Sequence, residues 1–210
     1  NERETIENIN YINRATKGVY ELGSVFKTFT IAAGLDAELV EPETKFLNLE
    51  KKLTCGKSTI TEYDNKIPSD LTVEQILIRS GNIGSVRIGQ KLEIKKLKAF
   101  LENIGVLNKL SFDIEEVGEP IPFKWGKCKL ATVSFGHGIT TTPLQLAKGY
   151  AIISNGGFEI KPTLIKQDLT KLQKKKRIVK KGVSEKIIPI LRKIVTTKEG
   201  TAEFANIEGY

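Results

Sequence analysis

The chain has 210 residues, of which 40% are hydrophobic, and it carries a formal net charge of +8. This length and composition suit one globular domain or two small ones, and they exclude a chain too polar to bury a core. No apolar run approaches the ~18 residues of a membrane span, and the first residues lack the pattern of a signal peptide. Because the chain contains no methionine, we expect a processed or excised piece of a longer protein.

The elements expected along the chain are mainly helices. Apolar residues at helical spacing predict a largely buried helix from Ser24 to about Leu39, closed by Pro42. Residues 43–69 are expected to be irregular with short strands, because threonine and isoleucine alternate around 58–61. Further helices are expected from Thr72, which begins a capping box, to about Arg79, and then over 83–92, 93–103, 143–153 and 184–196.

Prolines, glycines and caps set the boundaries in the second half of the chain. Thr142-Pro143 places a cap and a first-turn proline at the start of one helix. Ser184 is expected to cap the last helix, which is expected to be kinked at Pro189. The segment 111–129 is expected to be a loop, and the β-branched, basic stretch 160–179 is expected to form a hairpin.

The two cysteines and the single histidine form no metal-binding pattern. Cys55 and Cys128 are far apart and lie in no C-x-x-C motif, so they are either free thiols or one disulfide. His137 lies between two glycines, where we favour a role in shaping a loop over a role as a base. With no cluster of ligands at suitable spacing, we expect neither a catalytic metal nor another cofactor.

A run of basic residues accounts for most of the net charge. Seven lysines and arginines lie within 171–181 without an acid between them, and without these seven the net charge is 8 − 7 = +1. Such a run can bind an anionic polymer or lipid, although we favour a solvated basic loop or edge strand. The neighbourhood lacks interleaved aromatic residues, so no nucleic acid is expected as a partner. A basic anion-binding module remains open as an alternative function.

Ser24 and Lys27 are the residues most suggestive of chemistry. A serine hydroxyl is a poor nucleophile at neutral pH and needs a neighbouring base. A lysine three residues later lies one helical turn away on the same face. The S-x-x-K spacing is a signature of penicillin-binding proteins and β-lactamases. Alone it is weak, because nine serines and 27 lysines in this chain predict roughly one such spacing by chance.

The chain as a whole resembles the transpeptidase domain of a class B penicillin-binding protein, a type used in bacterial septum or side-wall synthesis. Four stretches in the right order carry this resemblance. The first is N-R-A-T, G-V-Y-E and G-S within 13–24, and the second is R-S-G-N-I-G over 79–84. The third is S-F-G-H-G with T-P-L-Q-L-A within 134–147, and the fourth is G-T-A with G-Y within 200–210. The resemblance implies an α+β fold of the penicillin-binding protein and serine β-lactamase type. Residues 1–210 would form a partial transpeptidase domain, mainly its helical part with little of the sheet.

The third motif of this family, K-T-G, has no match in the chain. The stretch K-E-G-T over 198–201 imitates it, but this stretch follows a predicted helix instead of forming a strand. We expect the real motif a few residues beyond Tyr210, with further sheet strands outside the chain. The chain as given is therefore expected to acylate poorly and, with an exposed sheet edge, to be prone to aggregation.

The resemblance implies peptidoglycan cross-linking by serine D,D-transpeptidation. Ser24 would attack the carbonyl between two D-alanines of a stem peptide, and Lys27, kept near neutrality by burial and neighbouring donors, would take the serine proton. Ser80 would pass that proton towards the leaving D-alanine, and Asn82 would bind the substrate's backbone amide. An amine of a neighbouring stem would resolve the acyl-enzyme, whereas β-lactam antibiotics would trap it. Alternatively, Ser80 and Asn82 would simply cap the next helix.

Two alternatives share this chemistry: a β-lactamase-like hydrolase, with water as acceptor, and a β-lactam sensor, which acylates once and signals. No carboxylate stands out as a deacylating base, and the stretch 134–147 favours the transpeptidase. The resemblance also implies a location at the periplasmic face of the bacterial inner membrane, through an anchor absent from this chain. Cell-wall synthesis or division proteins would be partners of the full-length protein.

Overall fold

The computed structural model describes residues 12–167 and 176–207. Within these ranges no helix is long and apolar enough to cross a membrane. The elements follow one another as η2 (Gly23–Phe26), α1 (Lys27–Asp36), β1 (Lys45–Phe46), β2 (Lys52–Cys55), β3 (Ser58–Thr61), β4 (Leu71–Thr72), α2 (Val73–Ile78), α3 (Asn82–Ile104), α4 (Lys127–Val133), α5 (Pro143–Ser154), α6 (Lys181–Thr196) and η4 (Glu203–Ala205).

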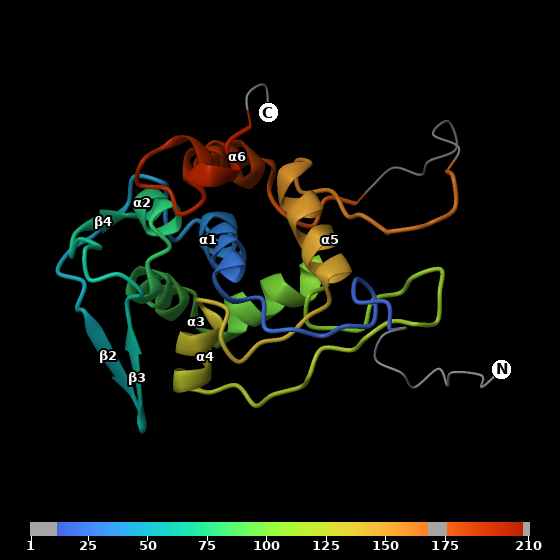
Figure 1. Ribbon diagram of the computed structural model, residues 1–210, viewed down its shortest axis with the longest axis horizontal. Helices are drawn as coiled ribbons and strands as arrows, with labels where there is room; N and C mark the ends of the chain where they lie inside the picture. The colour runs from blue at the N-terminus through green and yellow to red at the C-terminus, as the bar shows by residue number, and fades with distance from the viewer. Residues whose placement is uncertain (1–11, 168–175, 208–210) are drawn as a thin grey trace.

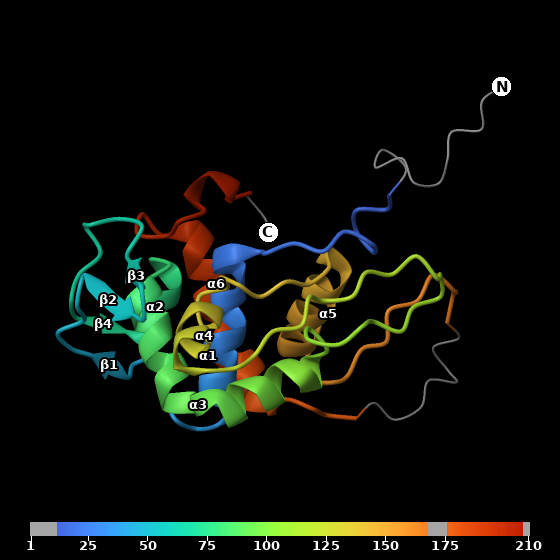
Figure 2. The same cartoon turned by 90° about the horizontal axis from the view of Figure 1, so that it is seen from below.

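Helix α1 lies at the centre of the molecule and contacts α2, α3 and α6 (Figure 1). Nine of its ten residues, from Lys27 to Leu35, are buried. A helix enclosed on all sides needs no polar face, which is why its apolar residues are not confined to one stripe. Figure 2 shows α3 running across one end of α1. Any side chain that α1 places inside the molecule is therefore held by neighbours on several sides.

Two helix starts predicted from the sequence are confirmed. Thr72 and Thr142 are the N-caps of α2 and α5, and each side chain accepts a hydrogen bond from the backbone N–H of a glutamine three residues later. Each glutamine side chain in turn accepts from the backbone N–H of the cap, which completes a capping box. The expected boundary between two helices after Leu92 is also present, as a non-helical Glu93 inside α3.

The strands form two separate antiparallel pairs, β1 with β4 and β2 with β3. The β2–β3 hairpin runs from the pair Lys52↔Thr61 to the pair Cys55↔Ser58, as the alternation around 58–61 predicts. The result is a helix-rich α+β arrangement with little sheet, in agreement with the expected fold class.

Two predictions about helices are wrong. The segment 111–129 is not a loop throughout, because α4 begins at Lys127; this helix has seven residues and no side-chain cap, so its local signal is weak. Its apolar residues are buried, and it packs on α3. Ser184 is not the cap of α6, which begins at Lys181. Instead, Ser184 is buried inside α6 and its hydroxyl bonds to the backbone of Gly156 and Ile153.

Other boundaries differ in smaller ways. The first helix begins with a 3-10 turn and ends at Asp36, three residues before the predicted end. Pro189 lies within α6, which ends at Thr196 as predicted. Of the hairpin expected over 160–179, the structure describes one isolated antiparallel bridge, between Phe158 and Arg177. Residues 168–175 of that hairpin lie outside the described ranges.

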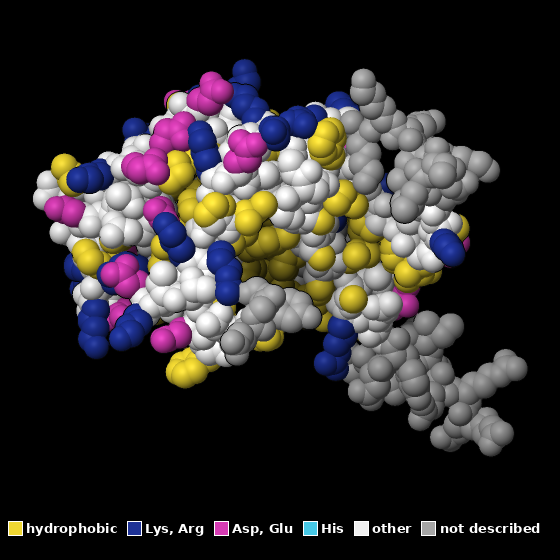
Figure 3. Space-filling model, turned by 90° about the horizontal axis from the view of Figure 1, so that it is seen from above, with side chains coloured by type: hydrophobic (Ala, Val, Ile, Leu, Met, Phe, Trp, Pro, Cys, Tyr) yellow, Lys and Arg dark blue, Asp and Glu magenta, His cyan; other side chains and the backbone are white. Residues whose placement is uncertain are grey.

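Figure 3 views the molecule from above, relative to Figure 1, and the face that it shows is hollowed near its middle. Figure 3 shows apolar side chains gathered around this hollow, with charged side chains at its rim and over the part of the face to its left. Monomeric proteins rarely expose a large contiguous apolar surface. A hollow of this kind is typical of a face that packs against a further segment or molecule.

A disulfide joins Cys55 to Cys128, with a Cα–Cα distance of 5.3 Å, which answers a question that the sequence leaves open. It links the tip of the β2–β3 hairpin to the start of α4 and spans 73 residues of chain. A cross-link over a loop of this length restricts the unfolded chain strongly, and native disulfides typically contribute about 2–4 kcal/mol.

We therefore expect the double variant Cys55→Ser/Cys128→Ser to lose about 2–4 kcal/mol of unfolding free energy. Urea denaturation of the protein, with and without a reducing agent, measures this loss. The reduced wild type should unfold at the same urea concentration as the double variant. A wild type whose unfolding midpoint is unchanged by reduction would contradict this assignment.

Candidate active site

Ser24, Lys27 and Ser80 meet at the N-terminal end of α1. The Lys27 Nζ donates to the Ser24 hydroxyl at 3.1 Å, to the Ser80 hydroxyl at 2.8 Å and to the Ser80 backbone carbonyl at 2.5 Å. Ser24 is exposed, whereas Lys27 is fully buried. An accessible hydroxyl is thus bonded directly to a buried amine, which is the arrangement that activation of a serine nucleophile requires.

Burial changes the acid–base behaviour of Lys27. None of its surface is accessible to solvent, and removal from water lowers its pKa from 10.5 to about 8. The negative charge of Glu62 acts in the opposite direction and raises this pKa. With a pKa of about 8, roughly a tenth of the Lys27 side chains are neutral at pH 7, a few hundred times the fraction for an ordinary lysine. Only this neutral amine can accept a proton.

Ser80 has an unusual backbone conformation. Its φ angle of 54° lies in the left-handed region, which residues with a side chain rarely adopt. It occupies the short turn between α2 and α3, and in this conformation both its hydroxyl and its carbonyl bond to Lys27. Strained residues of this kind persist when the surrounding contacts impose the conformation, and they are common at functional sites.

Asn82 lies in the same turn and is partly exposed. Its side-chain Nδ2 donates to the carbonyl of Thr61 at 2.8 Å. Its side-chain Oδ1 accepts no hydrogen bond from residues 12–167 or 176–207. This oxygen belongs to the first residue of α3, two residues after Ser80.

Neither Ser80 nor Asn82 caps α3 with its side chain. The N-cap is Gly81, which has no side chain for that purpose. Glu62 caps the helix instead, because its carboxylate accepts hydrogen bonds from the backbone N–H groups of Asn82 at 2.6 Å and of Ile83 at 2.9 Å. The capping interpretation of Ser80 and Asn82 is therefore wrong.

Glu62 is the residue of this site that sequence patterns do not reveal. A carboxylate near a helix N-terminus is favourable, but usually it lies in the first turn or directly before it. Glu62 is 20 residues away from Asn82 in the chain. Its only signal in the sequence is its position directly after the alternating stretch 58–61, at the end of a predicted strand.

The backbone leading to Ser24 is held by a distant, glycine-rich loop. Gly136 has a φ of 87°, and a Cβ atom at this position would lie 1.9 Å from the carbonyl oxygen of Gly23, so a side chain does not fit. Tyr20 and Thr141 form an antiparallel bridge with backbone hydrogen bonds of 3.0 and 3.1 Å. Two stretches far apart in the sequence thus pack together and fix the turn that carries Ser24.

Tyr150 of α5 supports the same turn from inside the molecule. Its hydroxyl lies 2.8 Å from the carbonyl oxygen of Val25 and 2.9 Å from the hydroxyl of Thr28. Burial raises the pKa of the Tyr150 hydroxyl, which keeps it protonated and able to donate. The residue next to Ser24 therefore has a fixed backbone carbonyl.

His137 lies in the glycine-rich loop as a surface residue. Its side chain is 66% exposed, and its Nδ1 is 3.2 Å from a carboxylate oxygen of Glu21. No hydrogen bond joins it to Ser24 or Lys27 within the described ranges. This placement agrees with a role in shaping the loop and gives no support to a role as the base.

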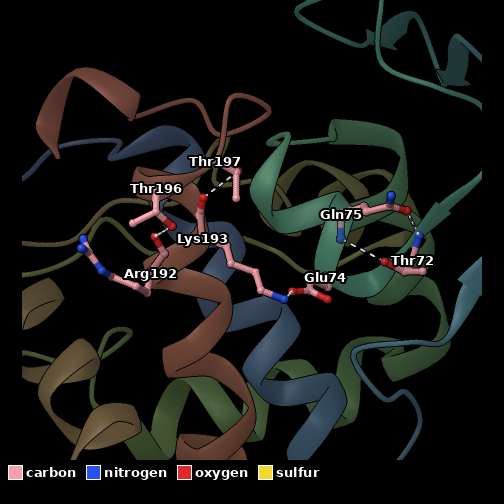
Figure 4. Close-up of polar contacts among 7 residues, drawn as sticks. All are labelled: Thr72, Glu74, Gln75, Arg192, Lys193, Thr196 and Thr197. Carbon is pink, nitrogen blue, oxygen red and sulfur yellow. Dashed lines mark hydrogen bonds and ion pairs between the residues drawn. The ribbon is translucent and has the colours of Figure 1, made fainter.

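Helix α2, which ends directly before Ser80, is braced by the C-terminal part of the chain. Figure 4 shows Lys193 of α6 paired with Glu74, next to the capping box of α2. Arg79 is paired with Glu199 at 2.7 Å. The turn of Ser80 thus follows a helix that is anchored at both ends.

This chain is similar in sequence to proteins of known family. The family model described as "Penicillin binding protein transpeptidase domain" matches residues 1–210. Probable peptidoglycan D,D-transpeptidase FtsI of Caulobacter vibrioides is 30% identical over 191 residues, which cover 90% of this chain and 32% of that protein. Probable peptidoglycan D,D-transpeptidase PenA of Neisseria flavescens is 30% identical over 201 residues, which cover 94% of this chain and 48% of that protein.

A solved structure agrees as well. The crystal structure of a peptidoglycan glycosyltransferase from Burkholderia ambifaria superposes with a TM-score of 0.88 at 24% identity, covering 96% of this chain and 64% of that chain. This similarity establishes a shared fold. The chain spans less than half the length of the two curated relatives described above.

Proposed function

Since this chain belongs to the penicillin-binding protein transpeptidase family, we propose that it provides the nucleophile of a serine D,D-transpeptidase that cross-links peptidoglycan. One observation supports this most strongly: the buried amine of Lys27 is bonded to the exposed hydroxyl of Ser24 at 3.1 Å. Relatives named as peptidoglycan D,D-transpeptidases align with most of the chain.

In the first half of the proposed reaction, the Ser24 oxygen attacks the carbonyl carbon between two D-alanines of a stem peptide. Neutral Lys27 takes the hydroxyl proton as the C–O bond forms. The C–N bond then breaks, and the Ser80 hydroxyl, 2.8 Å from the Lys27 Nζ, relays a proton to the leaving D-alanine nitrogen. The Oδ1 of Asn82 accepts an N–H of the substrate backbone and so orients the scissile bond.

In the second half, an amine of a neighbouring stem attacks the ester carbonyl. A new peptide bond forms, the ester bond to Ser24 breaks, and the proton of the amine returns to the serine oxygen through Lys27. A β-lactam would enter the same first step. Its ring opens without releasing a separate leaving group, so the adduct on Ser24 would persist.

The disulfide supports a periplasmic location for this domain. Disulfides persist in oxidising compartments such as the bacterial periplasm and are rare in the cytosol, and the chain pairs both of its cysteines. We propose that the full-length protein acts at the periplasmic face of the inner membrane, where cell-wall synthesis or division proteins would be its partners.

Transfer to an amine tests this function. The intact protein, meaning the full-length protein that contains this chain, is incubated with a peptide ending in D-Ala-D-Ala and with a D-amino acid as acceptor. The products are followed by mass spectrometry. A transpeptidase gives the peptide with the acceptor in place of the terminal D-alanine, and this product should be absent with Ser24→Ala. Release of D-alanine without transfer would instead indicate a hydrolase, and a single acylation without turnover would indicate a sensor.

The anion-binding alternative receives no specific support. Part of the basic run over 171–181 lies outside the described residues. Of its described members, Lys180 is paired with Glu38 at 2.8 Å and Lys181 with Glu185 at 3.2 Å. These lysines are engaged with acids of the same chain.

A further inference from the structure

We propose that Glu62 is a positioning residue of this site, which holds the Ser80–Asn82 segment through backbone hydrogen bonds and places a negative charge on the segment that Lys27 contacts at Ser80. This role rests on the proposed function of Ser24, Lys27 and Ser80. It adds a residue outside the motifs that contain those three.

The hydrogen bonds of Glu62 fix the start of α3. Its two carboxylate oxygens accept the N–H groups of Asn82 and Ile83, the first two residues of the helix. These N–H groups have no acceptor within the helix itself, and a negative charge at this end is favoured by the helix dipole. Because the N-cap Gly81 offers no side chain, Glu62 is the residue that satisfies this helix start.

The end of β3 thereby controls the conformation of the whole turn. The carbonyl of Thr61, the neighbour of Glu62, accepts a hydrogen bond from the side-chain Nδ2 of Asn82 at 2.8 Å. Thr61 therefore holds the side chain of Asn82, and Glu62 holds its backbone. Ser80 keeps a φ of 54° only while its surroundings impose it. Without Glu62 we expect the turn to relax and the Ser80 hydroxyl to move away from Lys27.

Glu62 also acts on Lys27 through its charge. The carboxylate stabilises the protonated amine and so raises the pKa of Lys27, against the larger lowering by burial. In this way it limits how strongly burial depresses the pKa. From α5, the Tyr150 hydroxyl bonds to the hydroxyl of Thr28, the residue directly after Lys27, and burial raises the pKa of Tyr150.

Other titratable groups also lie near Glu62. The pKa of Tyr63 is raised chiefly by burial and then by the charges of Asp64 and Glu62, while Arg79 lowers it. Arg79 is itself paired with Glu199. Burial and the charge of Glu62 are the causes of the shift in the pKa of Lys27, so removal of the Glu62 charge should change that pKa.

Two variants separate the roles of Glu62. Glu62→Gln keeps the size of the side chain and one acceptor oxygen but removes the charge, whereas Glu62→Asp keeps the charge on a shorter side chain. The measurement is the second-order rate of labelling of the intact protein by a fluorescent penicillin between pH 5 and 9. In the wild type this rate should rise with pH up to the pKa of Lys27.

For Glu62→Gln we expect the midpoint of the pH profile to fall by about half a pH unit or more, because the protonated amine loses its counter-charge. The plateau rate should drop about tenfold, because the turn is held less firmly. For Glu62→Asp the midpoint should stay at the wild-type value. Glu50→Gln is the matched control, since it removes an exposed carboxylate that is bonded to Arg87 outside this site, and it should change neither quantity.

A midpoint for Glu62→Gln that equals the wild-type midpoint would overturn the proposal, whatever happens to the plateau. If thermal unfolding shows that Glu62→Gln does not fold, the plateau of Glu62→Asp decides: a loss of threefold or more supports the proposal, and a wild-type rate overturns it. Labelling of the wild type at a residue other than Ser24 would count against the proposed function and not against the role of Glu62.

Discussion

Ser24→Ala is expected to lower the rate of β-lactam labelling of the intact protein by about 10⁴-fold or more, because the atom that forms the ester is gone. The fold should survive, since Ser24 is exposed and its side chain makes one hydrogen bond within the described part of the chain, to Lys27. Time courses with a fluorescent penicillin measure the rate, and thermal unfolding verifies the fold.

Ser58→Ala is a suitable control for this experiment. Ser58 is an exposed serine on β3, so its replacement removes a hydroxyl without touching the site. It should be labelled at the wild-type rate. Labelling of Ser24→Ala at a similar rate would mean that another residue is the nucleophile.

Lys27→Met is expected to slow labelling by about 10²–10⁴-fold, the usual contribution of a general base. Methionine keeps most of the length and volume of lysine but cannot accept a proton. In the wild type the labelling rate should fall about tenfold for each pH unit below about 8, the pKa of Lys27, because the protonated amine is inactive as a base. In the variant this pH dependence should disappear.

The same substitution should change the pH dependence of stability. The pKa of Lys27 is about 8 in the folded protein and 10.5 without burial, so between these values the unfolded chain binds more protons. Unfolding free energy of the wild type therefore rises with pH across this window, by up to about 3 kcal/mol, and is not changed further by Lys27 below pH 8. Lys27→Met lacks this rise, so its stability relative to the wild type should decline from pH 8 to 10.5.

Urea denaturation at pH 7.5 and pH 10 measures this difference, with Lys95→Met as control. Lys95 is exposed on α3, and its replacement should leave the pH dependence of the wild type unchanged. Parallel stability curves for Lys27→Met and the wild type would contradict a lowered pKa for Lys27.

Features encoded by neighbouring residues are predictable from this sequence. The spacing of Ser24 and Lys27 places them one helical turn apart, and the hydrogen bond of 3.1 Å between them confirms that geometry. The capping boxes at Thr72 and Thr142 are local in the same sense, since all partners lie within three residues. The approach of Ser80 to this pair followed from the family resemblance and not from spacing.

Features set by distant partners are not predictable in this way. Ser184 looks like a cap because serine favours that position, but in the structure its hydroxyl bonds to the end of α5 and the residues after it. Helix α4 has only weak local signals, and its buried residues and the disulfide at Cys128 depend on contacts with other segments. Glu62 reaches a helix that starts 20 residues later. The depth at which Lys27 is buried likewise depends on all the helices around α1.

Locating the adduct by mass spectrometry tests the central claim most directly. The intact protein is treated with a β-lactam, digested, and the modified peptide is fragmented to find the acylated residue. We predict a single adduct, on Ser24, because its hydroxyl is exposed and bonded to Lys27. An adduct on Ser80 or on any other residue of the folded protein, or no adduct at all, would contradict this account.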